Sequence, residues 1–388
     1  SVISKYWGVY LNDFMRLMGW NANTNLTFGS FHIDIAPIII VAFFTTLLVF
    51  GTKIGARVDG AMTVLKIAIV FFVVIVGFFY VKASNFTPFI PPSQPASTVE
   101  GSSAVTGVMP QPLWQFATGM TPSVYGVPGI LSGAALVFFA FIGFDVVATA
   151  SEETKNPHKN VPLGIGVGML LIIVMYMLVA VVTTGMVSYA DLAKQDSPSL
   201  ATAFELVGAD WAAKIISFGI VLGLATVVMV LLLGLTRIVF AMSRDGLLPR
   251  GLSKTGKHGT PAALQIVVGA VVALVAAFFD IGVLSDMVNI GTLSAFTLVA
   301  ISIPIMRKKR PDLPRAFKMP GSPWIPILIA VANFWLMLNL SVLTWIRFVV
   351  WLVVGFAIYF GYGYWHARLG KGDLTETLSA ETDKAVNG

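Results

Sequence analysis

Two ionisable side chains, Lys66 and Asp145, lie deep inside long apolar stretches of this chain, where a charge is rarely retained without a function. Lys66 stands in the run GAMTVLKIAIVFFVVIVGFFYV, and Asp145 stands in LVFFAFIGFDVVATASEETKNP. A charge near the centre of a bilayer costs at least about 2.5 to 3.5 kcal/mol, so a charge that is retained there normally faces the protein interior and binds or relays something. We therefore expect the function to reside at these two positions.

The residues that lead up to Asp145 indicate where a helix could break. The run FFAFIGFD places a glycine, Gly143, among bulky aromatic side chains near the middle of an apolar stretch. A helix broken at Gly143 would free backbone carbonyls that can accept hydrogen bonds from a substrate ammonium group. The alternative is an unbroken helix, with Gly143 in a tight helix contact and Asp145 paired to a neighbour.

Nine long apolar stretches run along the chain, and Lys66 and Asp145 lie within two of them. The chain has 388 residues, of which 56% are hydrophobic and 11% are charged, whereas about 25% are charged in an ordinary soluble domain. This composition excludes a water-soluble fold, and we expect an all-α membrane protein because most stretches reach the roughly 17 to 25 residues of a spanning helix. The two charges retained within these stretches indicate a membrane transporter. The stretches are 35–51, 60–81, 129–150, 163–190, 215–236, 262–279, 287–306, 319–346 and 348–365.

Basic residues mark alternate connections between these stretches. They gather at 53–57, 155–159, 244–257 and 307–318, while connections 20–33, 82–128 and 191–214 hold few of them. The positive-inside rule places the first set in the cytoplasm and the second set outside, and it makes the carboxyl terminus cytoplasmic. Since topology explains the basic clusters, and the stacking aromatics and soluble module of a nucleic-acid binder are lacking, we expect no nucleic-acid partner.

Residue types that hold metals, cofactors or disulfides are scarce in this sequence. The chain has no cysteine, which excludes a thiolate metal site and a disulfide-linked subunit. The histidines lie at the ends of apolar stretches or in connections, at His32, His158, His258 and His366. None of these positions suits an intramembrane metal or hydrolase centre, so the sequence predicts no catalytic residue, no metal and no cofactor.

One transmembrane domain accounts for most of the chain. We expect it to cover residues 1–370, with its longest connection, the proline-rich segment 82–128, outside the membrane. The polar stretch 371–388 carries scattered charges and cannot bury apolar surface. It is therefore predicted to be a disordered cytoplasmic tail.

Several motifs together resemble those of one transporter family. The segment FFAFIGFDVVATASEETKNPHKNVPLGI resembles the sixth-helix signature of the cationic amino acid transporter branch, in its bacterial form, of the amino acid–polyamine–organocation permeases. GTKIGARVDGAMTVLKIAIV resembles the fourth loop and fifth helix, SNFTPFIPPS the external loop, LLLGLTRIVFAMSRDGLLP the eighth helix and its loop, and KKRPDLPRAFKMPGSPWIPIL the approach to the eleventh helix. The resemblance covers nearly the whole chain.

This resemblance implies a fold, an activity and a location. The family fold is a five-plus-five inverted repeat (LeuT-like) of twelve helices that works by alternating access. Because SVISKYWGVYL resembles the external half of the third helix, we expect a truncated form of it, an incomplete copy with nine full transmembrane helices plus a partial one. The implied activity is secondary active amino acid transport by a multi-pass protein of the plasma (cytoplasmic) membrane.

The resemblance also implies which residues bind the substrate. Phe139, Ala140 and Ile142 match the family's backbone ligands of the substrate amino group, and Phe139 also matches its aromatic gate. Gly143 and Asp145 follow directly and are expected to belong to the same site. Leu224 falls where the eighth helix of the family lines the side-chain pocket, which predicts an apolar wall there.

Lys66 matches the lysine that proton-driven members of the family place where sodium-driven relatives of the fold hold an ion. Burial in an apolar environment disfavours the charged form of a lysine, so this group could load and release a proton near neutral pH. The resemblance therefore implies proton coupling through Lys66. The alternative is a snorkelling lysine whose ammonium reaches the cytoplasmic interface.

Two other function classes compete with the transporter hypothesis. A non-transporting homologue that acts as a membrane partner or sensor would fit the expected truncation. An intramembrane enzyme would need an acid–base pair or a metal cluster within the spans. The apolar stretches offer only Lys66 and Asp145 and no histidine, which makes the enzyme the weaker alternative.

Overall fold

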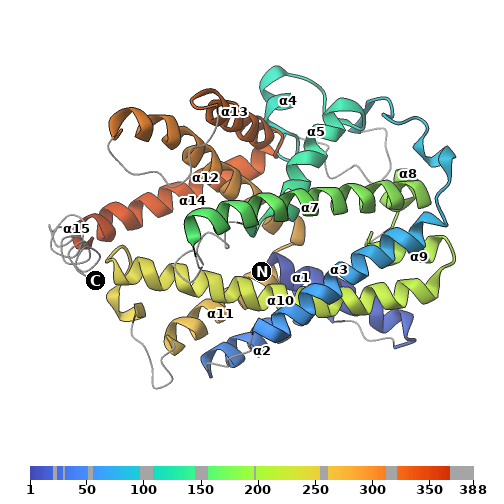
Figure 1. Ribbon diagram of the computed structural model, residues 1–388, viewed down its shortest axis with the longest axis horizontal. Helices are drawn as coiled ribbons and strands as arrows, with labels where there is room; N and C mark the ends of the chain where they lie inside the picture. Colours follow the sequence, from blue (N-terminus) through green and yellow to red (C-terminus); the bar gives the residue numbers. More distant parts are fainter. Residues whose placement is uncertain are drawn as a thin grey trace.

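A computed structural model describes residues 1–20, 24–28, 31–50, 56–96, 108–144, 156–195, 198–253, 261–311 and 321–367, and this part of the chain is mostly helical (Figure 1). Long apolar helices dominate it, as the composition predicts. The protein is an all-α membrane protein.

Five helices are long and apolar enough to cross a membrane. They are α3 (Ala56–Phe78), α7 (Pro157–Met186), α10 (Asp210–Arg244), α12 (Ile281–Lys309) and α14 (Val342–Ile358), which continues through η7 (Tyr359–Gly363) into α15 (Tyr364–His366). Four shorter apolar helices accompany them: α2 (Ile35–Val49), α5 (Gly126–Val137), α11 (Ala262–Phe278) and α13 (Trp324–Leu338). Each of the nine stretches singled out in the sequence overlaps one of these helices.

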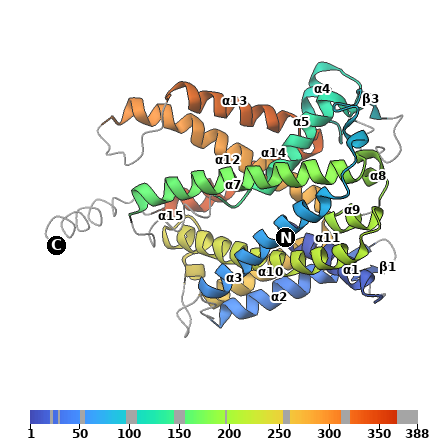
Figure 2. The ribbon, with the colours of Figure 1, turned by 45° about the vertical axis from the view of Figure 1, so that its right-hand side comes forward.

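Shorter elements connect the long helices. They are α1 (Val2–Leu17), β1 (Asn25–Phe28) paired with β2 (Phe31–Asp34), η1 (Ala83–Phe86), β3 (Gln94–Pro95) paired with β4 (Ser123–Val124), α4 (Leu113–Thr118), η4 (Phe138–Phe141), α8 (Tyr189–Ala193), α9 (Leu200–Leu206) and η6 (Arg250–Ser253). Figure 2 shows α4, α8, α9, β1 and β3 gathered at one end of the helices. The three connections that are predicted to be external thus meet at the same end.

The long helices pack in two groups. In one, α1 and α3 pack against α10, and α2 packs against α11; in the other, α12 packs against α13 and α14. Helix α7 lies between the groups in both views (Figures 1 and 2). Helix α5 packs on the second group, against α12 and α13. The end of α5 and the turn η4 that follows it therefore lie beside α12.

Serine residues start three of the helices at the end that carries α8 and α9. The hydroxyls of Ser188, Ser199 and Ser341 accept hydrogen bonds from backbone N–H groups in the first turns of α8, α9 and α14. Such caps satisfy donors that a helix start leaves without an intrahelical partner, and each contributes about 1 kcal/mol. They fix where the chain leaves its connections and enters a helix.

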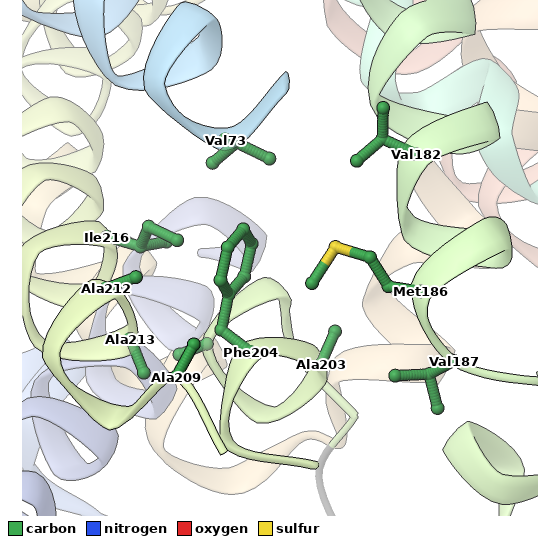
Figure 3. Packing of buried hydrophobic residues seen from close by; sticks show 11 residues of the cluster. Val73, Val182, Met186, Val187, Ala203, Phe204, Ala209, Ala212, Ala213 and Ile216 are labelled. Carbon is green, nitrogen blue, oxygen red and sulfur yellow. The ribbon is translucent and has the colours of Figure 1, made fainter. Parts of the chain in front are cut away.

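Phe204 on the short helix α9 anchors a buried cluster between α3, α7 and α10. Its ring is 1% exposed and lies among Val73, Met186 and Ile216 (Figure 3). Burying a phenylalanine side chain contributes about 1.5 to 3 kcal/mol. This short helix thus holds the ends of three spanning helices together.

An ion pair ties α9 to α1 at the same end. Arg16 donates from Nη1 and Nη2 to the two carboxylate oxygens of Glu205 at 2.8 and 2.7 Å. The hydroxyl of Ser199 donates to the carboxylate of Asp13 at 2.9 Å. A bidentate arginine–carboxylate pair fixes the relative geometry of its two side chains as well as contributing energy. These contacts therefore hold α1 and α9 in a fixed relative position.

Candidate functional site

Regular α-helix ends at Val137 on the element that carries the predicted substrate ligands. Residues Phe138–Phe141 form the 3₁₀ turn η4, Ile142 is extended with φ −68° and ψ 135°, and Gly143 has φ +121°. An L side chain rarely adopts that φ, whereas glycine does so without a steric penalty. Of the two alternatives for this segment, the structure has the broken helix.

The break changes what the backbone carbonyls of η4 bond to. The carbonyl of Phe139 accepts from the N–H of Ile142 at 3.1 Å. The carbonyl of Ala140 accepts instead from the side chain of Tyr176 on α7, whose hydroxyl lies at 2.8 Å. A carbonyl oxygen has two lone pairs, so the Ala140 oxygen retains the capacity for a second donor.

Tyr176 is a site residue that the sequence reasoning missed. Its ring also packs edge-on against Phe141, with centroids 5.2 Å apart. A tyrosine hydroxyl within an apolar span needs a hydrogen-bond partner. That requirement is the sequence signal that could have linked Tyr176 to a helix break.

Aromatic side chains from two other helices surround the break. Phe138 and Phe144, on either side of it, both contact Phe296 of α12, with centroid distances of 6.1 and 5.2 Å. Phe139 faces Tyr6 of α1 at 6.4 Å. The broken segment is therefore held by rings from α1, α7 and α12 while its backbone stays irregular.

Lys66 lies against α10 at a glycine. A Cβ placed on Gly223 would meet Cγ, Cε and Cδ of Lys66 at 3.3, 3.7 and 3.9 Å. The aliphatic part of the half-buried lysine therefore lies along the backbone of α10 at Gly223. Leu224, the predicted pocket wall, is the next residue and is half-buried as well.

The structure brings the predicted residues together in two sets. Phe139, Ala140, Ile142 and Gly143 lie within five consecutive residues at the break, and Lys66 lies against Gly223, the residue before Leu224, on the α3–α10 side. Helix α1 packs on α10, and its Tyr6 faces Phe139. Asp145 lies outside the described residues.

Metal ligands do not cluster in the described part of the chain. Within it, no group of three or more histidine, cysteine, aspartate or glutamate side chains could hold a metal ion. What the break offers is carbonyl oxygens, which bind cationic donors such as an ammonium group through hydrogen bonds.

Comparison with known proteins shows which family this chain belongs to. A family model described as amino acid permease matches residues 6–363. The branched-chain amino acid permease BcaP of Bacillus subtilis is 39% identical over 96% of this chain and 74% of its own length. The methylthioribose transporter of the same organism is 38% identical over 86% of this chain and 65% of its own length.

A plant relative extends the range of named substrates. The vacuolar cationic amino acid transporter 4 of Arabidopsis thaliana is 34% identical over 72% of this chain and 42% of its own length. These relatives are transporters and not enzymes, and the family model spans every helix that carries a candidate site residue. The chain belongs to the amino acid permease family.

Proposed function

We propose that this protein is a secondary active amino acid transporter whose substrate amino group binds at the break between η4 and Gly143. The observation that carries the proposal is the irregular backbone of Ile142 and Gly143 within an apolar span. Backbone outside a regular helix is tolerated at membrane depth where it lines a cavity or is buried in protein, and transporters bind substrates at such breaks.

The carbonyls of Phe139, Ala140 and Ile142 are the proposed ligands of the substrate ammonium. The hydrogen bond from Tyr176 to Ala140 supports this role, because it holds one carbonyl of the break in a fixed direction and leaves a lone pair open. Asp145, which follows the break in sequence, is proposed to complete the anionic side of the site.

The proposed substrate is an amino acid with an apolar side chain. Leu224 is proposed as part of the wall of its side-chain pocket, beside the close contact between α3 and α10. The relative named for branched-chain amino acids matches 96% of this chain, whereas the plant relative named for cationic amino acids matches 72%. Leucine is therefore the first substrate to test.

Lys66 is proposed to couple transport to protons. Its stem packs on Gly223, thirteen residues into α10 and so about 20 Å along that helix from Asp210, which supports a position near the middle of the membrane. A lysine in that environment can bind and release a proton as its surroundings change between states. The protein is proposed to lie in the plasma membrane with its carboxyl terminus in the cytoplasm.

Uptake into proteoliposomes tests this proposal. We expect radiolabelled leucine to accumulate when the lumen is alkaline relative to the outside at a clamped membrane potential. Lys66→Ala should abolish the dependence on the proton gradient. Lys66→Arg should abolish it too, because a guanidinium stays charged over the accessible pH range.

A lysine at the end of a span provides the control. Lys214 lies exposed in the first turns of α10, and Lys214→Ala should leave the gradient dependence unchanged. Full activity and the original pH dependence in Lys66→Arg would show that Lys66 carries no proton, and a failure of the unaltered protein to accumulate any amino acid would contradict the proposal as a whole.

A further inference from the structure

A cavity of about 660 Å³ opens where α4, α5 and α8 come together, at the end of the helices that the charge pattern predicts to be external. The start of α12 and the turn between α13 and α14 complete its wall. Its lining includes Tyr125, Leu136, Tyr189, Asp286, Asn339 and Ser341. Nothing in the function proposed above uses this cavity.

The segment 109–113 forms the roof of the cavity and is hydrogen-bonded to its wall. The segment 109–113 pairs through its backbone with the α13–α14 turn: Leu113 N–H donates to the carbonyl of Leu340 at 3.0 Å, Val342 N–H donates to that of Gln111 at 3.0 Å, and Leu343 N–H donates to that of Met109 at 2.9 Å. The cavity is thus a built feature and not a gap between loose loops.

Asp286 is the one charged residue in the described lining of this cavity. Its Oδ2 accepts a hydrogen bond from the hydroxyl of Thr344 at 3.0 Å, and its Oδ1 has no hydrogen-bond partner among the described residues. Arg347 lies one turn beyond Thr344 on α14 and acts on the carboxylate through space. It neither lines the cavity nor forms an ion pair with Asp286 in the described part of the chain.

Asn339 adds a buried acceptor without a hydrogen-bond partner to the same wall. The residue is 4% exposed, and its Nδ2 donates to the carbonyl of Trp335 at 2.8 Å, which fixes the direction of its amide. Its Oδ1 is buried without a hydrogen-bond partner in the described structure. A buried acceptor without a donor costs free energy, and Asp286 adds a negative charge to the same wall. This wall therefore favours a ligand that brings hydrogen-bond donors and a positive charge.

Aromatic rings decide what kind of cation fits. The rings of Tyr125 and Tyr189 lie with centroids 5.2 Å apart on the wall of the cavity. Aromatic faces attract ammonium groups, and a space of about 660 Å³ suits an organic molecule better than a single inorganic ion.

We infer that this cavity is an outer recognition site for organic ammonium groups, including the amino group of a substrate on its way to the break. Its lining includes Leu136, one residue before the end of α5 and its continuation into η4. The Leu136 carbonyl accepts from Asn289 of α12 at 3.3 Å. The identity of the ligand as a transport substrate rests on the proposed function, whereas the binding of an ammonium does not.

Titration calorimetry on the protein in lipid nanodiscs tests the inference with 2-phenylethylammonium. This probe has the ammonium and an apolar body but no carboxylate. We expect saturable binding, and 2-phenylethanol, its neutral counterpart, should bind at least about tenfold more weakly, because hydrogen bonds to charged groups are worth about 1.5 to 3 kcal/mol.

Variants assign the binding to the cavity. Asp286→Asn keeps an acceptor for Thr344 but removes the charge, and it should weaken probe affinity at least about tenfold. Asp191→Asn, an exposed acid on α8 outside the lining, should leave affinity unchanged. Tyr189→Leu should weaken it about two- to fivefold, and it serves as the second test if Asp286→Asn does not fold.

Four results would overturn the inference. They are the absence of probe binding, equal affinity for the alcohol, displacement of the probe by sodium at equal concentration, and unchanged affinity in both the Asp286 and Tyr189 variants. Probe binding without leucine uptake in proteoliposomes would remove the proposed transport function and leave the ammonium site in place.

Discussion

Helix α10 and the α5–η4 segment both carry glycines within apolar spans, yet one continues for 35 residues and the other breaks. In α10, a Cβ on Gly219 would collide with Ile69, and one on Gly223 would press on Lys66. At Gly143, no described residue other than its chain neighbours lies within 4 Å of the place where a Cβ would stand, but the backbone has φ +121°. The first two glycines allow close packing, and the third allows a backbone conformation.

Glycine in a membrane span therefore has two separable roles. A packing glycine is replaced at a cost set by its neighbour, which can move if it is a flexible side chain. A conformational glycine is replaced at a cost set by its own backbone, whatever space surrounds it. Substitutions to alanine distinguish the two, because alanine adds only one methyl group.

Gly143→Ala is the sharpest test and should have the largest effect. A positive φ of this kind costs an L residue of order 1 to 3 kcal/mol, so we expect leucine uptake to fall at least about tenfold even though the methyl group meets no neighbour among the described residues. Gly133→Ala in regular α5, where a Cβ also meets no neighbour, should transport normally. Equal uptake by the two variants would show that the backbone of Gly143 is not needed for transport.

Gly223→Ala should have an intermediate effect that appears in the pH profile. The methyl group would lie 3.3 Å from Cγ of Lys66, so the lysine must shift by a few tenths of an ångström while the helix stays intact. We expect uptake to persist with its half-maximal pH displaced. The matched variant Gly219→Ala crowds Ile69 one turn earlier and should lower thermal stability without moving the pH profile. A pH shift in both variants would assign it to helix packing and not to Lys66.

Tyr176→Phe should have the smallest effect of the three. It removes one neutral hydrogen bond to the Ala140 carbonyl, worth about 0.5 to 1.5 kcal/mol, and keeps the ring that packs on Phe141. We expect the KM for leucine to rise about two- to tenfold with little change in melting temperature. A lower KM would mean that the tyrosine hydroxyl competes with the substrate for this carbonyl.

The long helices could be predicted from sequence because each is a run of apolar residues with few charges, and the bilayer sets their length. The break could be narrowed to Gly143 but not decided, since a glycine among aromatic residues fits close packing as well as a positive φ. The structure separates the two by the positive φ of Gly143 and the crowding around Gly223.

Other features carry no periodic signal. Helix α9 has only seven residues within a predicted connection, so the buried position of Phe204 follows from tertiary packing alone. Tyr176 and Ala140 are 36 residues apart, and the acceptors Asp286 on α12 and Asn339 in the α13–α14 turn are brought to one wall only by the fold. Sequence gives the residue types of such sites, whereas their meeting depends on long-range geometry.

The backbone pairing between 109–113 and the α13–α14 turn should also slow amide hydrogen exchange. The amide hydrogens of Leu113, Val342 and Leu343 are held by it, and an amide exchanges with solvent deuterium only when its hydrogen bond opens. These three amides should form a slowly exchanging island within otherwise rapidly exchanging connections. If the roof lifts as one unit, their exchange rates should report a common opening free energy, which gives the fraction of time for which the cavity is open.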